Sequence, residues 1–305
     1  MIRVKKIACV CLAASTLFLG RPQPAAAQTA KFRHLASIYA DDQGAGLNLP
    51  EGVGCGVNGK VVVADTANGR LVRFTYVNKT VSGGSVIKIP ELSAPFRVQL
   101  NSKGEIYALD GKDRRIVHLS PEGEFKDAVT FEGAPPPATI LPKAFTIDLL
   151  DNIYVLDVSS SRVLVMNARG QFQKALPFPN DIGFGSDLAV DTAGGVLLLD
   201  SIRRRMFFAD KDATAFAPLG GDLSEALATM PTYLTTSKGS TFVALGSGSS
   251  IVTFRRDGSF IARQLNHGWE EGSLNHPSQM CINDKDEAFI ADRDNSRVQV
   301  FQLIR

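Results

Sequence analysis

A short apolar run recurs six times along the chain, and in five of the six cases it ends in an aspartate. The first run covers residues 60–65 and the last covers residues 287–292. No helical periodicity separates the runs, so their pitch favours the four-stranded blades of a β-propeller over a helical solenoid. The runs end at Asp65, Asp110, Asp157, Asp200, Leu245 and Asp292, which are 45, 47, 43, 45 and 47 residues apart.

Each unit divides into four predicted strands. The first strand follows a proline in five of the six units, and the apolar run forms the second strand after a glycine-containing turn. The third strand alternates apolar and polar residues, as in residues 297–301. A further glycine turn precedes the fourth strand, which opens with phenylalanine in three units. These markers are Pro50, Pro95, Pro142, Pro231 and Pro277, and then Phe125, Phe172 and Phe260.

The two ends of the chain complement each other. The sixth unit stops at Arg305 after its third strand, so it lacks a fourth strand. Residues 31–39 match the fourth strands of other units, with Phe32 in the place of Phe125 and Phe172. We therefore predict an all-β fold, a six-bladed β-propeller of four-stranded blades, in which the N-terminal strand completes the last blade and closes the ring.

Residues 64–74 and 291–301 carry the same pattern of alanine, aspartate, asparagine, arginine and alternating apolar residues. This pattern resembles the NHL repeat, and the resemblance extends over the chain from residue 28 onward. It implies an NHL-repeat six-bladed β-propeller of the exported bacterial type. The fourth unit departs from the pattern because it lacks the leading proline, and the fifth has Leu245 and Ser250 where the acid and the arginine belong.

The first 27 residues have the order of regions found in a secretory signal peptide. Arg3, Lys5 and Lys6 precede an apolar run over residues 7–19, and small residues follow up to Ala27. The run has 19 − 7 + 1 = 13 residues, which is too short for a membrane span of roughly 20 residues. We predict a signal peptide over residues 1–27, a propeller domain over 28–305, and a periplasmic or secreted protein.

Removal of this leader changes the charge of the chain. The leader holds four basic residues and no acidic one, so 33 − 4 = 29 basic side chains remain against 31 acidic ones. The resulting net charge of −2 argues against a nucleic-acid partner, which would require a basic surface. We expect a monomeric propeller without a membrane span or a bound nucleic acid.

An aspartate and an arginine five positions later flank the turn between the second and third strands in five units. A catalytic residue is needed once, whereas an architectural residue is needed in every blade. We therefore predict structural ion pairs at these turns. The pairs are Asp65 with Arg70, Asp110 with Arg115, Asp157 with Arg162, Asp200 with Arg205, and Asp292 with Arg297.

Two cysteines remain after loss of the leader, Cys55 and Cys281, on the first strands of blades one and six. Cys55 stands 65 − 55 = 10 residues before Asp65, and Cys281 stands 292 − 281 = 11 residues before Asp292, the aspartates that end the apolar runs of these two units. A one-residue offset turns side chains to opposite faces of a strand. We therefore expect two buried thiols, with a disulfide as the alternative.

Candidate catalytic and metal-binding residues are sparse. The four histidines do not gather as zinc ligands, and no serine lies in a Gly-x-Ser-x-Gly elbow. The strongest metal candidate is Glu51, which is placed like the glutamate that calcium-dependent lactonases of six-bladed form carry in the first blade. Asn180 and Asn283 are its conceivable partners. We expect no catalytic residue and no cofactor, with calcium as the alternative.

Loops between second and third strands and loops between blades lie on one face of a propeller. Arg203 and Arg204 on this face are additional to the repeat arginine, and His276 precedes a leading proline. We expect the partner-binding face to include His276, Arg203, Arg204, Arg293 and Arg114. The sequence thus favours a non-catalytic exported scaffold that binds a protein, peptide or envelope polymer. A calcium-dependent, gluconolactonase-like hydrolase is the alternative.

Overall fold

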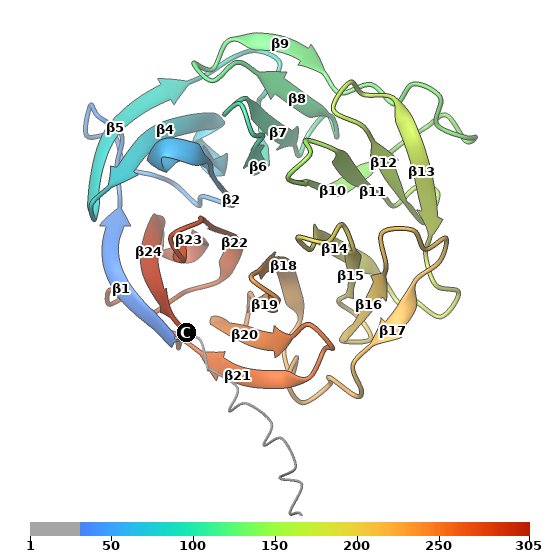
Figure 1. Cartoon of the computed structure of the whole chain (residues 1–305). Helices are drawn as coiled ribbons and strands as arrows, with labels where there is room; N and C mark the ends of the chain where they lie inside the picture. Colours follow the sequence, from blue (N-terminus) through green and yellow to red (C-terminus); the bar gives the residue numbers. More distant parts are fainter. Residues whose placement is uncertain (1–30) are drawn as a thin grey trace, which may run out of the picture.

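In the computed structural model, which describes residues 31–305, six four-stranded antiparallel sheets surround a central axis (Figure 1). Blade one contains β2 (Gly52–Cys55), β3 (Lys60–Asp65), β4 (Arg70–Val77) and β5 (Thr80–Ile87). Blade two contains β6 (Pro95–Leu100), β7 (Ile106–Asp110), β8 (Ile116–Leu119) and β9 (Phe125–Ala128). Blade three contains β10 (Pro142–Ile147), β11 (Ile153–Asp157), β12 (Arg162–Met166) and β13 (Phe172–Pro177).

Blades four to six follow the same order, from the innermost strand outward. Blade four contains β14 (Gly185–Val190), β15 (Val196–Asp200), β16 (Arg205–Ala209) and β17 (Ala217–Leu219). Blade five contains β18 (Pro231–Ser237), β19 (Ser240–Leu245), β20 (Ser250–Arg255) and β21 (Phe260–Gln264). Blade six contains β22 (Pro277–Ile282), β23 (Glu287–Asp292), β24 (Arg297–Ile304) and β1 (Lys31–Ile38). Short 3-10 turns lie at Val57–Gly59, Thr66–Asn68 and Arg293–Asn295. Within residues 31–305, no helix has the length and apolarity that crossing a membrane requires.

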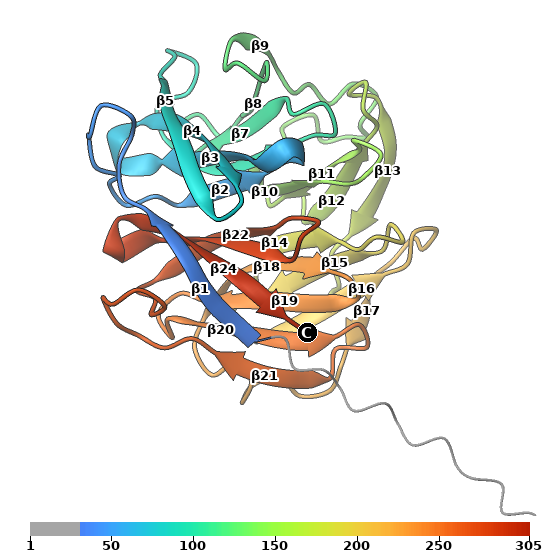
Figure 2. The same cartoon turned by 60° about the vertical axis from the view of Figure 1, so that its left-hand side comes forward.

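The N-terminal strand closes the ring, as predicted. Strand β1 pairs antiparallel with β24, so that Phe32 lies opposite Leu303 and Ile38 lies opposite Val298. Figure 2 shows the two strands side by side along the edge of the last blade. The Phe32 ring packs edge-on against Phe301 of the same blade, with 5.8 Å between ring centroids. The six-bladed fold and its closure are therefore confirmed, whereas the predicted signal peptide over residues 1–27 lies outside the described residues.

The core consists of layers between neighbouring blades. Between blades six and one, Val61 and Val63 of β3 pack with Phe289 and Ala291 of β23. The two valines stand four and two residues before Asp65, which ends β3. Phe289 and Ala291 stand three residues and one residue before Asp292, which ends β23. The front face of one blade thus packs on the back face of the next. Burial of these apolar layers is the main favourable term in the stability of the ring.

The same front-to-back packing corrects the prediction for the cysteines. Cys55 and Cys281 form a disulfide with 5.9 Å between their Cα atoms. The expectation of two free thiols was wrong because equivalent positions in adjacent blades point into different interblade layers. An offset of one residue therefore directs both side chains into the same layer, where both cysteines lie against the core between blades six and one.

Four of the five expected acid–arginine pairs lie within ion-pair distance. The nitrogen–oxygen distance is 2.6 Å for Asp65–Arg70, 3.0 Å for Asp157–Arg162, 3.5 Å for Asp200–Arg205 and 2.7 Å for Asp292–Arg297. The acids also accept backbone N–H groups of the preceding interblade loop, as Asp292 does from Asn275 at 2.6 Å. Each acid therefore fastens the loop that joins its blade to the previous one.

Blade two departs from this arrangement. Asp110 accepts hydrogen bonds from the backbone N–H groups of Ser93, Ala94, Lys112 and Asp113. These four donors occupy both carboxylate oxygens and lower the pKa of Asp110, against the effect of burial. Arg115 instead donates to the Glu91 carbonyl oxygen at 2.8 Å. The predicted pairing of Asp110 with Arg115 is therefore absent from the described structure.

Candidate functional site

A cleft of about 570 Å³ opens at one mouth of the propeller axis. Its lining includes one structurally equivalent residue from each blade, the residue at or next to the start of the innermost strand. Figure 1 looks along the axis that these innermost strands surround. The six residues are Glu51, Phe96, Lys143, Ser186, Thr232 and Ser278.

β-Bulges place most of these residues in the cleft. In β6, Pro95 pairs with Asp110 and Arg97 pairs with Leu109, so Phe96 is an extra residue outside the ladder. The ladders of β10, β14, β18 and β22 shift at the equivalent point. A bulge directs the extra side chain away from its ordinary course. The fold therefore aims one residue from each of these blades into the axial cleft.

A layer of polar side chains lies directly beneath. The Arg97 guanidinium is 3.3 Å from an Asp187 carboxylate oxygen and stacks over the Tyr233 ring, 4.6 Å from its centroid. Gln279 reaches across the axis, accepts a hydrogen bond from the Val98 N–H at 3.1 Å and donates to the Val98 carbonyl at 2.9 Å. These contacts join blades two, four, five and six and form the floor of the cleft.

One glycine makes this floor possible. A Cβ atom on Gly52 of β2 would lie 2.8 Å from the Ala64 Cβ and 3.0 Å from the Gln279 side-chain oxygen. Both distances are shorter than ordinary contacts between such atoms. Glycine at this position therefore allows Gln279 to extend to β6.

Burial dominates the charge state of Asp187. Its carboxyl is almost fully enclosed, and this desolvation raises its pKa to about 6, although Arg97 and the Leu234 N–H oppose the rise. The nitrogen–oxygen distances to Arg97 are 3.3 and 3.4 Å, too long for a strong bidentate pair. We therefore regard desolvation as the stronger effect at this position.

Lys143 is the other perturbed group of the cleft. Burial lowers its pKa, and the charges of Arg97 and Arg114 lower it further. The charges of Asp187 and Glu51 act in the opposite direction. Among residues 31–305, Lys143 has no hydrogen-bond or ion-pair partner. The cleft therefore holds an unpaired amine whose pKa lies below that of an ordinary lysine.

The predicted face residues divide between the cleft and its surroundings. His276 and Arg293 line the cleft, and Arg293 Nε lies 3.2 Å from a Glu51 carboxylate oxygen. Arg114 is outside the lining, although its charge acts on Lys143. Arg203 and Arg204 are exposed and also lie outside the lining.

Sequence reasoning missed Lys143, Arg97, Asp187, Tyr233 and Gln279 as site residues. One signal was available, because each stands one or two positions after the start of an innermost strand. These strands are otherwise mostly apolar. A charged or amide side chain at such a position must find a partner near the axis.

The cleft does not fit the calcium site that a lactonase-like interpretation implies. The Glu51 carboxylate is paired with the Arg293 guanidinium, and Arg97 and Lys143 also line the cleft. Asn180 is outside the lining, and Asn283 bonds to Glu287 in the turn between β22 and β23. Within residues 31–305, no three acid, histidine or cysteine side chains gather as metal ligands. A divalent cation at Glu51 would face three like charges.

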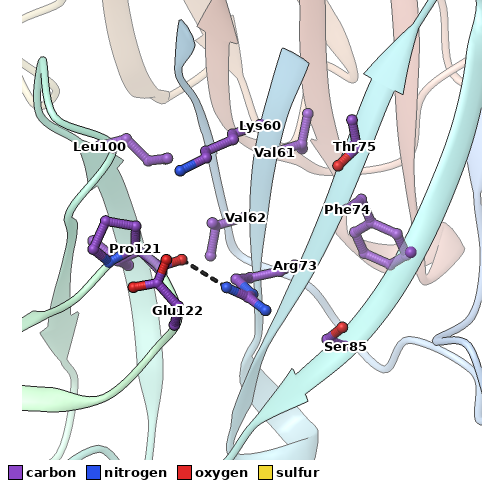
Figure 3. Close-up of a pocket in the computed structure, with 13 residues that line it drawn as sticks. Lys60, Val61, Val62, Arg73, Phe74, Thr75, Ser85, Leu100, Pro121 and Glu122 are labelled. Carbon is purple, nitrogen blue, oxygen red and sulfur yellow. Dashed lines mark hydrogen bonds between the residues drawn. The ribbon is translucent and has the colours of Figure 1, made fainter. Parts of the chain in front are cut away.

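A second cavity, of about 240 Å³, lies between blades one and two. Figure 3 shows Arg73 of β4 extending toward the turn at Pro121 and Glu122, whereas Lys60 of β3 points toward Leu100. Arg73 Nη1 donates to the Pro121 carbonyl oxygen at 2.7 Å, which joins the two blades. We place the functional site at the axis instead, because the axial cleft is larger and receives side chains from all six blades.

The raised pKa of Asp187 predicts a pH dependence of stability. A carboxyl that binds its proton more tightly in the folded chain contributes stability below its unfolded pKa of 3.8, and this contribution is lost as the pH rises through about 6. Relative to Asp187→Asn, the wild type should lose roughly 3 kcal/mol of unfolding free energy between pH 3.5 and 7. Urea denaturation of both proteins across this range measures the difference, and parallel curves would contradict it.

The comparisons with known proteins agree with this fold. The NHL-repeat family model matches residues 274–301. No curated protein sequence matches the chain. Similar solved structures include a gluconolactonase from Xanthomonas campestris, at 12% identity and a TM-score of 0.64 over 90% of each chain. Virginiamycin B lyase from Staphylococcus aureus has 13% identity and a TM-score of 0.61, and covers 90% of this chain and 100% of its own.

A PQQ-bound aldose sugar dehydrogenase from Streptomyces coelicolor is also similar, at 14% identity and a TM-score of 0.60 over 90% of this chain and 99% of its own. At these identities the likeness establishes the fold alone. All three neighbours are nevertheless enzymes, and this finding overturns the expectation of a non-catalytic binding scaffold. The lack of a catalytic sequence motif was a poor guide, because an axial site takes single residues from separate blades.

Proposed function

We propose that this chain, an NHL-repeat six-bladed β-propeller, is an enzyme that hydrolyses a lactone or ester bond in its axial cleft, with Lys143 as the residue that moves the proton. The observation that carries the proposal is the unpaired Lys143 amine, whose pKa is lowered in a cleft beside Arg97. Perturbed amines of this kind are favourable for acid–base catalysis at moderate pH. One of the similar structures is described as a gluconolactonase, which supports the choice of a lactone-hydrolysing enzyme, whereas the other two are described as a lyase and a dehydrogenase.

The proposed reaction has two steps. Neutral Lys143 takes a proton from a water molecule as the water oxygen attacks the carbonyl carbon, and the carbonyl π electrons move to its oxygen. The resulting oxyanion is stabilised by the positive charge of Arg97, which lines the cleft. The carbon–oxygen bond of the leaving alcohol then breaks, and the Lys143 ammonium returns its proton to that oxygen. No external oxidant or reductant is required.

The floor of the cleft holds the charges in position. Asp187 and the Tyr233 ring fix the Arg97 guanidinium from below, and Arg97 raises the positive potential at Lys143. Glu51 and Arg293 neutralise each other at the rim. The proposed chemistry therefore depends on Lys143 and Arg97, and it assigns no metal to Glu51.

We further propose that the enzyme acts outside the cytoplasm as a monomer. The leader-like sequence over residues 1–27 and the Cys55–Cys281 disulfide both support export to an oxidising compartment. One chain supplies all six lining positions, so the cleft is complete without a second subunit.

A hydrolysis assay tests the proposal. The mature chain, residues 28–305 with its disulfide formed, is mixed with simple γ- and δ-lactones and aryl esters in weakly buffered indicator solution. We expect saturable hydrolysis with kcat on the order of 1–10³ s⁻¹. The rate should rise with pH as Lys143 loses its proton, and it should not change when EDTA is added. No turnover above buffer up to pH 9, or loss of activity with EDTA, would show the proposal to be wrong.

A further inference from the structure

One wall of the axial cleft is apolar and open to solvent. Phe184, Ile202 and Met230 line it and are 40%, 61% and 57% exposed. They come from blade four and from the loop that leads into blade five. Exposed apolar side chains that gather beside a cleft mark a surface that contacts a ligand or partner. We call these three residues the apolar lip.

The remaining walls carry the charges. Glu51, Arg97, Lys143 and Arg293 come from blades one, two, three and six. Figure 1 shows β14 and β18 as neighbours on one side of the axis, with β2, β6 and β10 on the other side. The cleft therefore has one side with exposed apolar residues and another side that carries the charges together with Phe96.

The backbone holds the apolar lip in place. The Phe184 N–H donates to an Asp200 carboxylate oxygen at 3.1 Å, and the Phe184 carbonyl accepts the Ser201 N–H at 3.1 Å. These two bonds fasten the segments that carry Phe184 and Ile202 to each other. The exposed side chains are thus presented from a fixed frame and not from a loose loop.

We infer that the substrate is a lactone or ester that carries an apolar substituent on its lactone ring or on its ester alcohol, and not a polyhydroxylated sugar lactone. This inference rests on the proposed function, because it places the reacting carbonyl at Lys143. An alkyl or aryl substituent would cover the apolar lip and remove it from water. The hydroxyl groups of a sugar lactone would instead lose hydrogen bonds to water against Phe184, Ile202 and Met230.

Binding to a Lys143→Met variant tests the inference without turnover. Three probes share a six-membered lactone ring: δ-decalactone with a pentyl chain, unsubstituted δ-valerolactone, and glucono-δ-lactone. By titration calorimetry we expect δ-decalactone to bind at least tenfold more tightly than either of the others. Equal or tighter binding of glucono-δ-lactone would overturn the inference.

Substitutions in the apolar lip locate the effect. Adding Ile202→Ser and Met230→Ser to Lys143→Met should reduce the preference for δ-decalactone to threefold or less, whereas adding Met230→Leu should keep it. Leu149→Ser is the matched control, because Leu149 is 78% exposed and lines a different cavity. A preference that survives both serine substitutions, or that is lost in the control, would contradict the assignment.

The outcomes separate this inference from the proposed function. Selective binding to Lys143→Met, together with no hydrolysis of any probe by the wild type, would support ligand selection by the apolar lip but would remove the proposed reaction. Hydrolysis of all three lactones at equal kcat/KM, with equal affinities, would retain the reaction and overturn the inference.

Discussion

Replacing Lys143 by methionine is expected to lower kcat/KM for lactone hydrolysis about a thousandfold, within the range that positioned acid–base groups contribute. Methionine keeps the length and apolar stem of lysine but cannot take up or release a proton. The same change removes a half-buried charge next to Arg97 and Arg114, so the melting temperature should stay constant or rise. Initial rates and thermal unfolding of the two proteins measure both effects.

Two further variants make this prediction sharper. Lys143→Arg keeps the positive charge but does not titrate in the accessible pH range, so it should also be inactive if proton transfer is the role of Lys143. Arg203→Met is the matched control, because Arg203 is an exposed cation outside the cleft, and its activity should equal that of the wild type. Activity of Lys143→Met within threefold of the wild type would exclude Lys143 from catalysis.

The second large effect concerns the disulfide. Cys55 and Cys281 are 226 residues apart in the sequence, so their bond closes a loop that contains most of the chain in the unfolded state. The chain-entropy relation for a loop of this size gives about 5 kcal/mol, and native disulfides typically contribute 2–5 kcal/mol. We expect Cys55→Ser with Cys281→Ser to lower the free energy of unfolding by about 3–5 kcal/mol.

Urea unfolding with and without reductant provides the control for this prediction. The reduced wild type should unfold at nearly the same urea concentration as the double variant, and the reductant should not affect the variant. If the oxidised wild type and the double variant unfold at the same urea concentration, the disulfide does not stabilise the ring. In that case the pairing of β1 with β24 would be the main interaction that holds the ring closed.

The blades could be predicted because their signals are local. Alternation within a strand, a glycine turn and a leading proline each depend on a few neighbouring residues, and a pitch of 43–47 residues repeats them around the ring. Phe32 was recognisable for the same reason, since it begins a strand that looks like the fourth strand of other blades. Ring closure followed from these patterns without any contact information.

The disulfide and the axial site required information that the pattern lacks. The offset between Cys55 and Cys281 had been interpreted within a single sheet, whereas the relevant geometry is the packing of one blade on the next. The pattern was also insufficient at Asp110, whose carboxylate accepts backbone N–H groups in place of the expected arginine. Lys143 and Asp187 lie on different blades, and only the assembled ring shows that they share a site.

The bulges at the innermost strands have a consequence for how such a protein can change over time. Phe96, Lys143, Ser186 and Thr232 are extra residues that take no position in the strand ladders. Substitutions there should alter the chemistry of the cleft while the hydrogen bonds that define the blades remain. A gene that encodes this ring could therefore acquire a new substrate through a few single-codon changes, each passing through a folded intermediate protein.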